Sequence, residues 1–390
     1  MVRQLYLAAT GQNRGKTTAA LGLLDGFLGR GLHTGFLKPV GQRTVIEDGV
    51  PADEDAVLMK TVFGLPESYA DMSPVHIPRG FTKSYIAGDV VEDLPARIAD
   101  AHAAFRDHDI VLVEGTGHAG VGAVIGLSNA TVAAMLGTPA IIISEGGVGR
   151  PIDEIVLNAA LFASHGVEVA GAIVNKVDLE AQPGIAAVLE RGLARHGIPL
   201  LGVLPVKPLL SNPTLGMIVD GVHGETIHAG PDLDRVIDGV AIGAMEPGHM
   251  LDRVGPGTLV IVPGDREDVI LTLVTAHLVS RDLEDTPAGS AAMRMAEDVG
   301  ASGVDGHEGA AVGLVLTGGY RPRPAVLEAI RDADLFATIV PEDTYSVASE
   351  VHDLLVKTHP ADREKIELIK DLVAECLDVE RVLAVARPAR

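Results

Sequence analysis

Short apolar runs alternate with longer amphipathic segments along the first 205 residues. The apolar runs predict buried strands at Leu5–Ala9, Thr34–Leu37, Ile110–Val113, Ala140–Ser144, Glu168–Val174 and Leu200–Leu204. The segments between them predict helices at 16–30, 53–63, 93–105, 129–136, 151–165 and 183–196. Strands that alternate with helices indicate an α/β fold with a doubly wound, mostly parallel sheet. Ligands bind such sheets at the carboxyl ends of the strands.

A second alternating pattern follows residues 206–222, a stretch with several Pro and Gly residues that we interpret as a linker. It predicts a second, smaller α/β domain with strands at Thr258–Val262, Ala311–Leu316 and Leu335–Val340 and helices at Arg266–Leu278, Pro324–Ile330 and Thr344–Val356. An acidic, Gly- and Ala-rich segment at 280–310 predicts a long mobile insertion, and apolar positions at helical spacing predict a terminal helix over 361–386. We therefore expect domains at 1–215 and 216–360, followed by a C-terminal helix at 361–390.

Composition narrows the kind of protein. The chain has 390 residues and a net charge of −22, which argues against a surface for nucleic acid or anionic membrane. No apolar run approaches the length of a membrane span, and the first strand follows Met1 too closely for a signal peptide. The single cysteine, Cys376, excludes an internal disulfide. We expect a cytoplasmic protein.

The most informative motif is Thr-Gly-Gln-Asn-Arg-Gly-Lys-Thr at residues 10–17, between the first strand and an apolar helix. This order predicts a phosphate-binding loop of the P-loop NTPase type, in which backbone N–H groups surround the phosphates of a nucleotide. The loop is a variant, because its usual first glycine is replaced by Thr10. The lysine would reach the β/γ oxygens and the first threonine after it would ligate Mg²⁺. The candidate nucleotide-binding residues are Thr10, Gly11, Gln12, Asn13, Arg14, Gly15, Lys16, Thr17 and Thr18.

Charged residues lie at other predicted strand ends and could converge on this loop. Lys38 follows the second strand and could offset negative charge on a substrate or a γ-phosphate, as a catalytic cation beside Lys16. Glu114 ends a buried strand, where a carboxylate is costly unless it is paired or bound to metal. We expect it to ligate Mg²⁺ together with a carboxylate from Asp55 or Asp53, of which we favour Asp55. Asp53 could also cap the helix that follows it.

Asn175 to Asp178 follow another strand and read Asn-Lys-Val-Asp. The amide of Asn175 could contact a purine edge. Asn-Lys-x-Asp is also a guanine-reading signature of GTPases, although Asp178 could equally cap a turn. The histidines show no spacing typical of a metal site. His118 could line the nucleotide site, although we favour an exposed loop position for it.

These motifs together resemble dethiobiotin synthetase, a P-loop ligase that closes a ureido ring with ATP and carbon dioxide. The matching stretches are Thr10–Thr17, Gly35–Val40, Val111–Gly115, Ala170–Asn175 and Pro199–Pro205. The resemblance implies ATP and Mg²⁺ as cofactors. It also implies that Lys16 and Thr17 bind phosphate and Mg²⁺, that Glu114 and Asp55 or Asp53 complete the metal site, that Lys38 faces substrate and that Asn175 holds adenine.

The second domain resembles the DRTGG domain, whose name residues match Asp265-Arg266 and Thr317-Gly318-Gly319. The pairing of the two domains is similar to the N-terminal, non-catalytic part of long bacterial phosphotransacetylases. The acetyltransferase domain that would follow there is missing, so we expect no acetyl transfer. Departures from the synthetase pattern at Ala9, Gly11, Gly117-His118 and Ser73–His76 spare the ATP-binding parts and leave the diamine substrate in question.

Three functions are therefore weighed. The first is a ligase-like enzyme that uses Mg-ATP to phosphorylate a carboxylate or carbamate. The second is a nucleotide-sensing regulatory protein without acetyltransferase activity, and the third is a GTP-driven switch. The expected partners are a small-molecule substrate or effector and, because related synthetase sites lie near a subunit interface, a second copy in a homodimer. We expect neither nucleic acid nor membrane as a partner.

Overall fold

A computed structural model describes residues 2–47, 49–255, 257–284, 311, 313–354 and 357–388. The chain forms two compact units. Unit 1 consists of Met1–Lys207 together with Thr358–Arg390, and unit 2 consists of Pro208–Lys357. The C-terminal segment, which was expected to stand apart as a helix, therefore belongs to the same unit as the phosphate loop.

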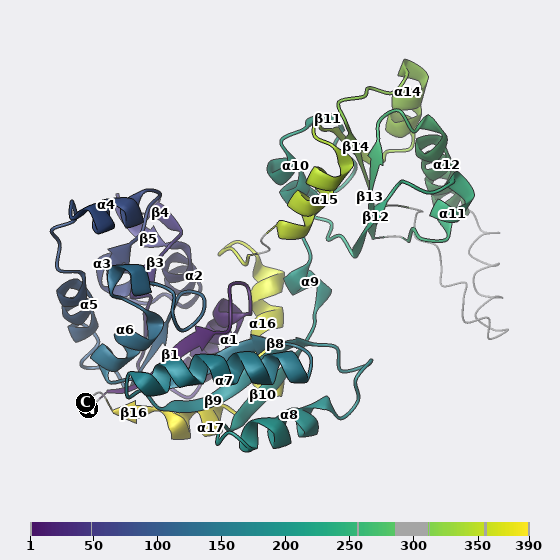
Figure 1. The fold of residues 1–390 in the computed structure, drawn as a ribbon. Helices are drawn as coiled ribbons and strands as arrows, with labels where there is room; N and C mark the ends of the chain where they lie inside the picture. Colours follow the sequence, from purple (N-terminus) through teal and green to yellow (C-terminus); the bar gives the residue numbers. More distant parts are fainter. Residues whose placement is uncertain are drawn as a thin grey trace. The chain divides into compact units, whose positions relative to one another are not determined.

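Unit 1 is built on a seven-stranded sheet in which six strands are parallel, in the order β10-β9-β8-β1-β7-β2 (Figure 1). The strands are β1 (Arg3–Ala9), β2 (Thr34–Leu37), β7 (Ile110–Glu114), β8 (Ala140–Glu145), β9 (Val169–Val177) and β10 (Leu200–Pro205), with β16 (Arg387–Pro388) antiparallel to the start of β1. All six parallel strands were predicted from the apolar runs. They are almost entirely buried, as parallel strands covered on both faces must be.

Helices connect and cover these strands. They are α1 (Lys16–Leu28), α2 (Glu54–Phe63), α3 (Tyr69–Met72), α4 (Phe81–Ala87), α5 (Leu94–Ala103), η1 (Ala123–Ile125), α6 (Asn129–Leu136), α7 (Gly149–Ser164), α8 (Ile185–Ala194), α16 (Arg363–Cys376) and α17 (Val379–Val385). The connection through α1 leads from β1 toward β2, whereas those through α6, α7 and α8 lead the opposite way along the sheet. Because such crossovers are right-handed, α1 lies on one face and α6 to α8 on the other, which is the doubly wound arrangement that the sequence predicted.

The segment between β2 and α5 holds short elements that the sequence did not predict. They are β3 (Val40–Gly41), the β4 (Thr44–Glu47) and β5 (Val50–Asp53) hairpin, α3, β6 (Val75–His76) and α4. Elements this short carry too few residues for a periodic apolar pattern. Within the described ranges, no helix combines the length and the apolarity that a membrane crossing requires.

The predicted single helix at 361–386 is wrong in one respect, because the structure contains two. Leu377 is extended (φ −114°, ψ 129°) and ends α16, and Asp378 caps α17 by accepting a hydrogen bond from the Arg381 N–H at 3.1 Å. The helix α16 packs on α1 so closely that a Cβ on Gly22 would lie 2.3 Å from Cβ of Val373. Only a glycine at position 22 allows this approach.

Unit 2 has a five-stranded sheet in the order β11-β15-β14-β13-β12, in which β11 alone is antiparallel. Its elements are α9 (Pro208–Ser211), α10 (Leu215–Val222), β11 (Glu225–His228), β12 (Gly239–Ile242), α11 (Pro247–Leu251), β13 (Thr258–Pro263), α12 (Glu267–Glu284), β14 (Gly313–Thr317), α14 (Pro324–Asp332), β15 (Phe336–Ile339) and α15 (Thr344–Asp353). The first five residues of the predicted 280–310 insertion belong to α12, and 285–310 lie outside the described residues.

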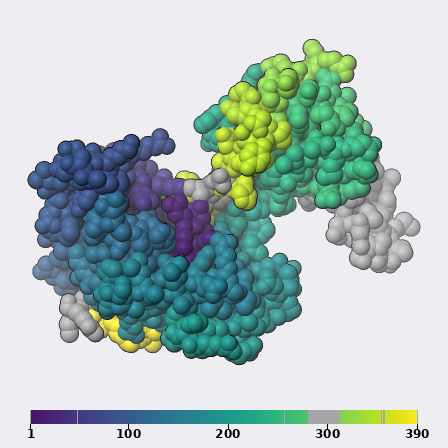
Figure 2. Space-filling model, viewed as in Figure 1, coloured from purple at the N-terminus to yellow at the C-terminus, as the bar shows by residue number. Residues whose placement is uncertain are grey.

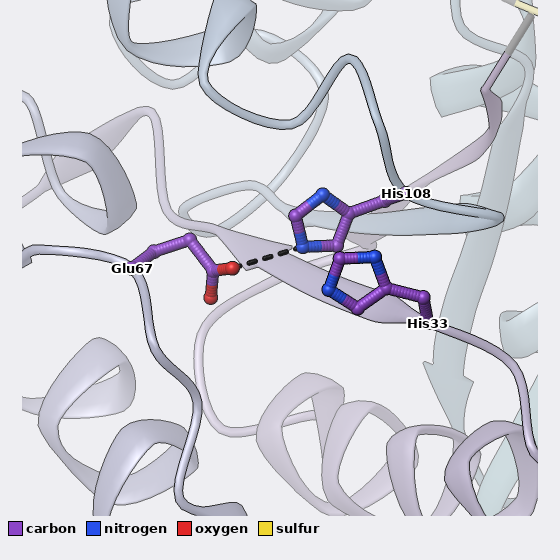
Figure 3. Close-up of side chains that lie close together, drawn as sticks. All are labelled: His33, Glu67 and His108. Atoms are coloured by element: carbon purple, nitrogen blue, oxygen red, sulfur yellow. Dashed lines mark hydrogen bonds and ion pairs between the residues drawn. The ribbon is translucent and has the colours of Figure 1, made fainter.

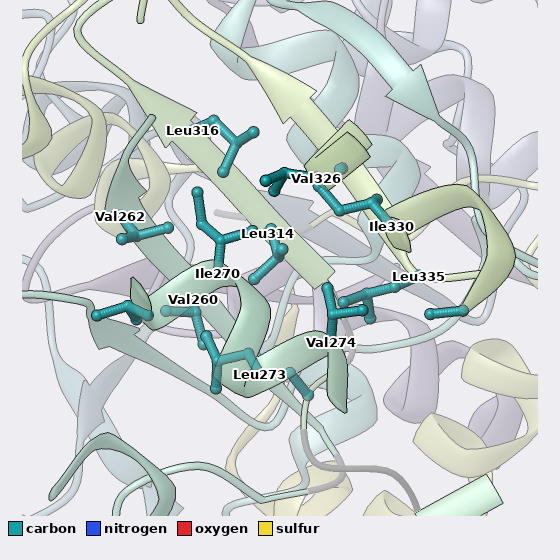
Figure 4. Packing of buried hydrophobic residues seen from close by; sticks show 14 of the residues in the cluster. Val260, Val262, Ile270, Leu273, Val274, Leu314, Leu316, Val326, Ile330 and Leu335 are labelled. Carbon is teal, nitrogen blue, oxygen red and sulfur yellow. The ribbon is translucent and has the colours of Figure 1, made fainter. Parts of the chain in front are cut away.

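Two apolar clusters form the core of unit 2. Figure 4 shows part of one of them, in which Leu314 and Leu316 of β14 pack against Ile270 and Leu273 of α12. The second cluster includes Leu215, Ile218 and Val222 of α10. The interpretation of 206–222 as a linker is therefore wrong for its second half, where three apolar residues at helical spacing enter the core.

Candidate functional site

The phosphate loop lies where the sheet reverses direction. The chain leaves β1 toward β2 on one side and later reaches β8 on the other, so the carboxyl end of β1 is a topological switch point. Gly15 adopts a left-handed conformation (φ 93°, ψ 29°) at the N-cap of α1, and a Cβ there would lie 1.9 Å from Nδ2 of Asn175. Lys16 is the first residue of α1 and is buried. The strand, loop and helix thus follow the predicted order.

Side chains from neighbouring strands hold this loop in place. Thr10 Oγ1 lies 3.1 Å from Ser144 Oγ at the end of β8, and Asn175 Nδ2 donates to the carbonyl oxygen of Arg14 at 3.1 Å. The guanidinium of Arg14 also forms an ion pair with Glu145. In this structure Asn175 supports the loop backbone, and its expected contact with adenine stays a prediction.

Beside the loop, four polar residues from four separate segments form a cluster that we call the acid–lysine cluster: Thr17, Lys38, Asp55 and Glu114. Lys38 Nζ donates to Asp55 Oδ2 at 2.5 Å and to Glu114 Oε1 at 2.9 Å. Thr17 Oγ1 donates to Asp55 Oδ1 at 3.1 Å and to Glu114 Oε1 at 3.3 Å. The convergence expected at the strand ends is therefore present for these four residues.

Burial controls the charges in this cluster. Glu114 is fully buried, and burial raises its pKa to about 7 although Lys38 acts in the opposite direction. Burial would lower the pKa of Lys38, but the charges of Asp55 and Glu114 raise it well above its usual value. Burial, together with repulsion from Lys38, lowers the pKa of Lys16 to about 8. Near neutral pH Lys38 and the neighbouring Lys16 are therefore charged, and Glu114 is close to its titration point.

The cluster also fits a small divalent cation. Glu114 Oε2 is buried and has no hydrogen-bond partner among the described residues, which is costly for a carboxylate oxygen. Two carboxylates and a threonine hydroxyl are the oxygen ligands that Mg²⁺ prefers. The unpartnered oxygen lies beside the phosphate loop, where a nucleotide-bound Mg²⁺ would supply the missing partner.

The two aspartates that the sequence left open have different positions. Asp53 accepts hydrogen bonds from the N–H groups of Asp55 at 3.1 Å and Arg43 at 3.4 Å, and it caps α2. Asp55 lies two residues further on, in the first turn of α2, against Thr17 and Lys38. The geometry therefore favours Asp55 over Asp53 as the carboxylate nearest the loop, and the metal role stays a proposal.

Two residues that the sequence did not single out shape the turn after Glu114. Tyr6 donates its hydroxyl to Asn129 Oδ1 at 2.8 Å, and the same oxygen accepts from Thr116 N at 3.0 Å. Gly115 must be glycine, because a Cβ there would lie 2.4 Å from Asn129 Oδ1. Burial raises the pKa of the Tyr6 hydroxyl, which keeps it a donor. No sequence signal links a strand tyrosine to an asparagine 123 residues later.

Asp178 takes a local role in the structure. Its carboxylate is exposed and accepts a hydrogen bond from Ala181 N at 2.8 Å, which closes a turn. The guanine-reading role of Asp178 stays a prediction. His118 is likewise exposed, and its Nδ1 accepts from Gly120 N at 3.1 Å.

In unit 2 the two halves of the Asp265-Arg266 and Thr317-Gly318-Gly319 pattern meet at the ends of adjacent strands. Gly264 N donates to the carbonyl oxygen of Thr317 at 3.0 Å. Arg266 pairs with Asp268 at 2.9 Å, and Gly318 and Gly319 adopt positive φ angles of 79° and 67°. The two halves of the pattern therefore lie in neighbouring turns at the same edge of the sheet.

The fold and the loop define a class, the P-loop nucleotide-binding proteins. The chain belongs to the family whose model is described as AAA domain, which matches residues 3–214. The model of the DRTGG domain matches residues 217–354, so a DRTGG domain follows the P-loop domain.

The similar curated proteins are phosphate acetyltransferases. One from Synechocystis sp. is 25% identical over 398 residues, covering 98% of this chain and 52% of the relative. Another, from Pseudomonas aeruginosa, is 27% identical over 396 residues, covering 96% of this chain and 51% of the relative. The chain thus spans about half the length of the curated relatives it matches. Among solved structures, the septum site-determining protein MinD from Pyrococcus horikoshii with Mg-ADP is 16% identical and has a TM-score of 0.33, covering 54% of this chain and 84% of that one.

Proposed function

We propose that unit 1 binds Mg-ATP and transfers its γ-phosphoryl group to a carboxylate or carbamate, as ligase-type enzymes do. The observation that carries this proposal is the buried, unpartnered Oε2 of Glu114 beside Thr17 and the phosphate loop. A carboxylate oxygen in this position is stabilised when a cation binds there, and Mg²⁺ accompanies nucleotides at such loops.

Each residue of the site would have a distinct role. Backbone N–H groups of 10–18 and the ammonium of Lys16 would bind the phosphates, and Thr17, Asp55 and Glu114 would hold Mg²⁺. Bound Mg²⁺ would supply positive charge to the phosphate oxygens. Lys38, held by hydrogen bonds to Asp55 and Glu114, would add a fixed positive charge where negative charge develops during transfer. Such fixed charges need no reorganisation during the reaction.

A second candidate is a nucleotide-sensing regulatory protein. Lys38 is only 4% exposed and already donates to two carboxylates, so its ammonium is not presented to an acceptor in this structure. This observation favours nucleotide binding without turnover, with unit 2 responding to the nucleotide or binding an effector.

Calorimetric titration of Mg-ATP into the wild type and into Lys16→Ala tests the binding site. Loss of binding in Lys16→Ala, with unchanged circular dichroism, is expected because this lysine opens α1 at the phosphate loop. Lys83→Ala on α4 is the matched control, since this lysine is exposed and should leave the affinity unchanged. Equal affinity in Lys16→Ala and the wild type would contradict the phosphate-loop assignment.

ADP release separates the two candidate functions. It is measured with Mg-ATP alone and after addition of diaminopelargonate and bicarbonate, the substrates that the synthetase resemblance implies. Stimulation of release supports the ligase-type reaction. Tight Mg-ATP binding without stimulation excludes diaminopelargonate as the acceptor and supports the sensing function. A strong preference for GTP that Asp178→Ala abolishes would instead support a GTP switch. Analytical ultracentrifugation with and without nucleotide tests the expected homodimer.

A further inference from the structure

A second cluster of side chains whose types can ligate a metal lies in unit 1 away from the phosphate loop. It consists of His33, Glu67 and His108, which we call the bis-histidine cluster (Figure 3). Each residue offers one ligand atom, and these atoms lie within 4.8 Å of one another. His108 Nε2 lies 2.9 Å from Glu67 Oε1, and one ring nitrogen of His33 also faces this carboxylate (Figure 3).

This cluster lies at the opposite edge of the sheet from the acid–lysine cluster. His33 directly precedes β2 and His108 lies just before β7, so both mark the amino ends of adjacent parallel strands. Lys38 and Glu114 lie at the carboxyl ends of the same strands. A strand of five residues is about 16 Å long, so the two clusters are separate sites.

Hydrogen bonds fix the segments that carry His33 and Glu67. His33 N donates to Asp109 Oδ2 at 2.8 Å, and Asp109 N donates to the His33 carbonyl oxygen at 2.8 Å. Lys60 Nζ donates to the carbonyl oxygen of Glu67 at 2.6 Å and thereby fixes the loop between α2 and α3. The cluster is therefore built from anchored segments rather than from freely moving side chains.

Hydrogen bonding also favours the tautomer of His33 that binds metals. His33 Nδ1 lies 3.2 Å from the carbonyl oxygen of Asp107, which can only accept, so Nδ1 carries the proton. In the neutral ring, Nε2 then presents a lone pair toward the Glu67 carboxylate. Metal-binding histidines commonly donate their other nitrogen to a carbonyl in this way.

Burial leaves one oxygen of this cluster without a hydrogen bond. The rings of His33 and His108 stack with centroids 3.9 Å apart. The side chain of Glu67 is 7% exposed and that of His108 is 5% exposed. Glu67 Oε2 is buried and has no hydrogen-bond partner among the described residues.

We propose that His33, Glu67 and His108 form a binding site for a divalent transition metal of the Zn²⁺ class. Two imidazole nitrogens and one carboxylate oxygen are a preferred donor set for Zn²⁺, and water would complete the coordination. Zn²⁺–ligand bonds of about 2.0–2.1 Å place tetrahedral ligand atoms about 3.3 Å apart, close to the separation of His108 and Glu67. The ring of His33 is exposed and stacked on that of His108, so it would turn out of the stack to place its Nε2 on the ion. The metal would tie the amino ends of β2 and β7 to the α2–α3 loop.

Zn²⁺ titration of the full, tag-free chain tests the site. The protein is first stripped with a chelator and then kept in excess Mg²⁺, which occupies the oxygen ligands at the phosphate loop. Wild type is expected to bind one Zn²⁺ per chain, measured by competition with a chromophoric chelator. His33→Ala and Glu67→Gln are expected to lower the affinity at least about 10-fold, since even residues outside the coordination sphere change it by this much.

Matched variants separate this site from other ligands. His196→Ala removes an exposed histidine elsewhere in unit 1 and should leave Zn²⁺ affinity unchanged. Glu114→Gln should also bind Zn²⁺ normally while its Mg²⁺ binding is weakened, so that failure of the two proposed sites can be distinguished. His33 is exposed, so His33→Ala should fold, and circular dichroism checks this.

Thermal unfolding gives a second readout. A ligand that binds only the folded state raises Tm, so Zn²⁺ should raise the Tm of the wild type and of His196→Ala but not of His33→Ala. Zn²⁺ affinity that is equal in wild type, His33→Ala and Glu67→Gln would overturn the proposal, as would failure of the wild type to bind Zn²⁺ in excess Mg²⁺. Glu67 would then serve only as the hydrogen-bond partner of His108.

Discussion

The ammonium nitrogen of Lys38 lies 2.9 Å from Oε1 of Glu114, and both side chains are almost completely buried. The two residues end adjacent parallel strands, β2 and β7, beside the phosphate loop. A buried charge is tolerated when its partner remains and becomes costly when the partner is removed. The stability of unit 1 therefore depends on a positive charge beside Glu114, supplied by Lys38 or by a bound cation.

Replacement of Lys38 by Met should destabilise unit 1 strongly. Asp55 and Glu114 would lose the cation that neutralises them, and removal of one partner from a buried ion pair typically costs about 3–5 kcal/mol. The free energy of unfolding, measured by urea denaturation, should recover in part when Mg²⁺ is added. Lys83→Met, an exposed lysine, is the control. An unchanged urea midpoint for Lys38→Met would show that the carboxylates are neutralised by another group.

Mg²⁺ affinity should rise as the pH rises through about 7. Burial raises the pKa of Glu114 to about 7, so below that pH its carboxyl group is mostly protonated and a proton competes with Mg²⁺. Above pH 7 the deprotonated carboxylate is available. Calorimetric titration of Mg²⁺ at several pH values measures this change. In Glu114→Gln the step near pH 7 should disappear, and its persistence there would assign the titration to a different group.

Nucleotide affinity, in contrast, should decrease as the pH rises through about 8. Burial and repulsion from Lys38 lower the pKa of Lys16 to about 8, so that above this pH the ammonium loses the charge that attracts phosphate. Because Lys16→Arg keeps its charge at this pH, an affinity in that variant that no longer decreases between pH 7 and 9 would support the assignment. A decrease of the same size in Lys16→Arg would contradict it.

Replacement of Asn175 by Ala should weaken binding of every nucleotide by a similar factor. The side chain supports the loop by donating to the Arg14 carbonyl oxygen, and loss of one hydrogen bond of this kind costs about 1 kcal/mol. Titrations with ATP, GTP and tripolyphosphate separate support of the loop from contact with the base. Equal weakening of all three indicates support of the loop. Weakening confined to ATP would instead support the adenine contact that the synthetase resemblance implies.

Leu314→Ala should destabilise unit 2 by about 2–5 kcal/mol, because it leaves a cavity in a packed core. Leu314 is fully buried between β14 and the helices that cover it (Figure 4). Leu271→Ala is the control, since that side chain on α12 is 37% exposed. Urea denaturation measures the change, with limited proteolysis used to detect the unfolding of unit 2. Equal destabilisation by the two substitutions would contradict the packing shown here.

Figure 2 draws all atoms in the view of Figure 1, so that the surface residues of one face can be followed by their colours along the sequence. In unit 1 the strands β1 and β8 are buried along almost their whole length. This burial explains why the apolar runs predicted these strands well, since a parallel strand covered on both faces needs a continuous apolar sequence.

The sequence alone determined the parts of the site that are close together in the chain. The strand, loop and helix around Gly15 and Lys16 follow from residues within one 30-residue stretch, because local conformation and apolar periodicity depend on neighbours in the chain. It also identified Lys38 and Glu114 as residues at strand ends. It did not separate Asp53 from Asp55, because a helix cap and a metal ligand favour the same residue type.

The tertiary structure decided which distant residues meet. It brought Asn175 to the loop at Arg14, Asn129 to Tyr6, and His33 to Glu67 and His108, although each of these contacts joins separate elements. It also placed α16 against α1, where Gly22 admits the side chain of Val373. Long-range contacts depend on strand order and on the packing of helices across the sheet, and neither quantity is encoded in the spacing of residues along the chain.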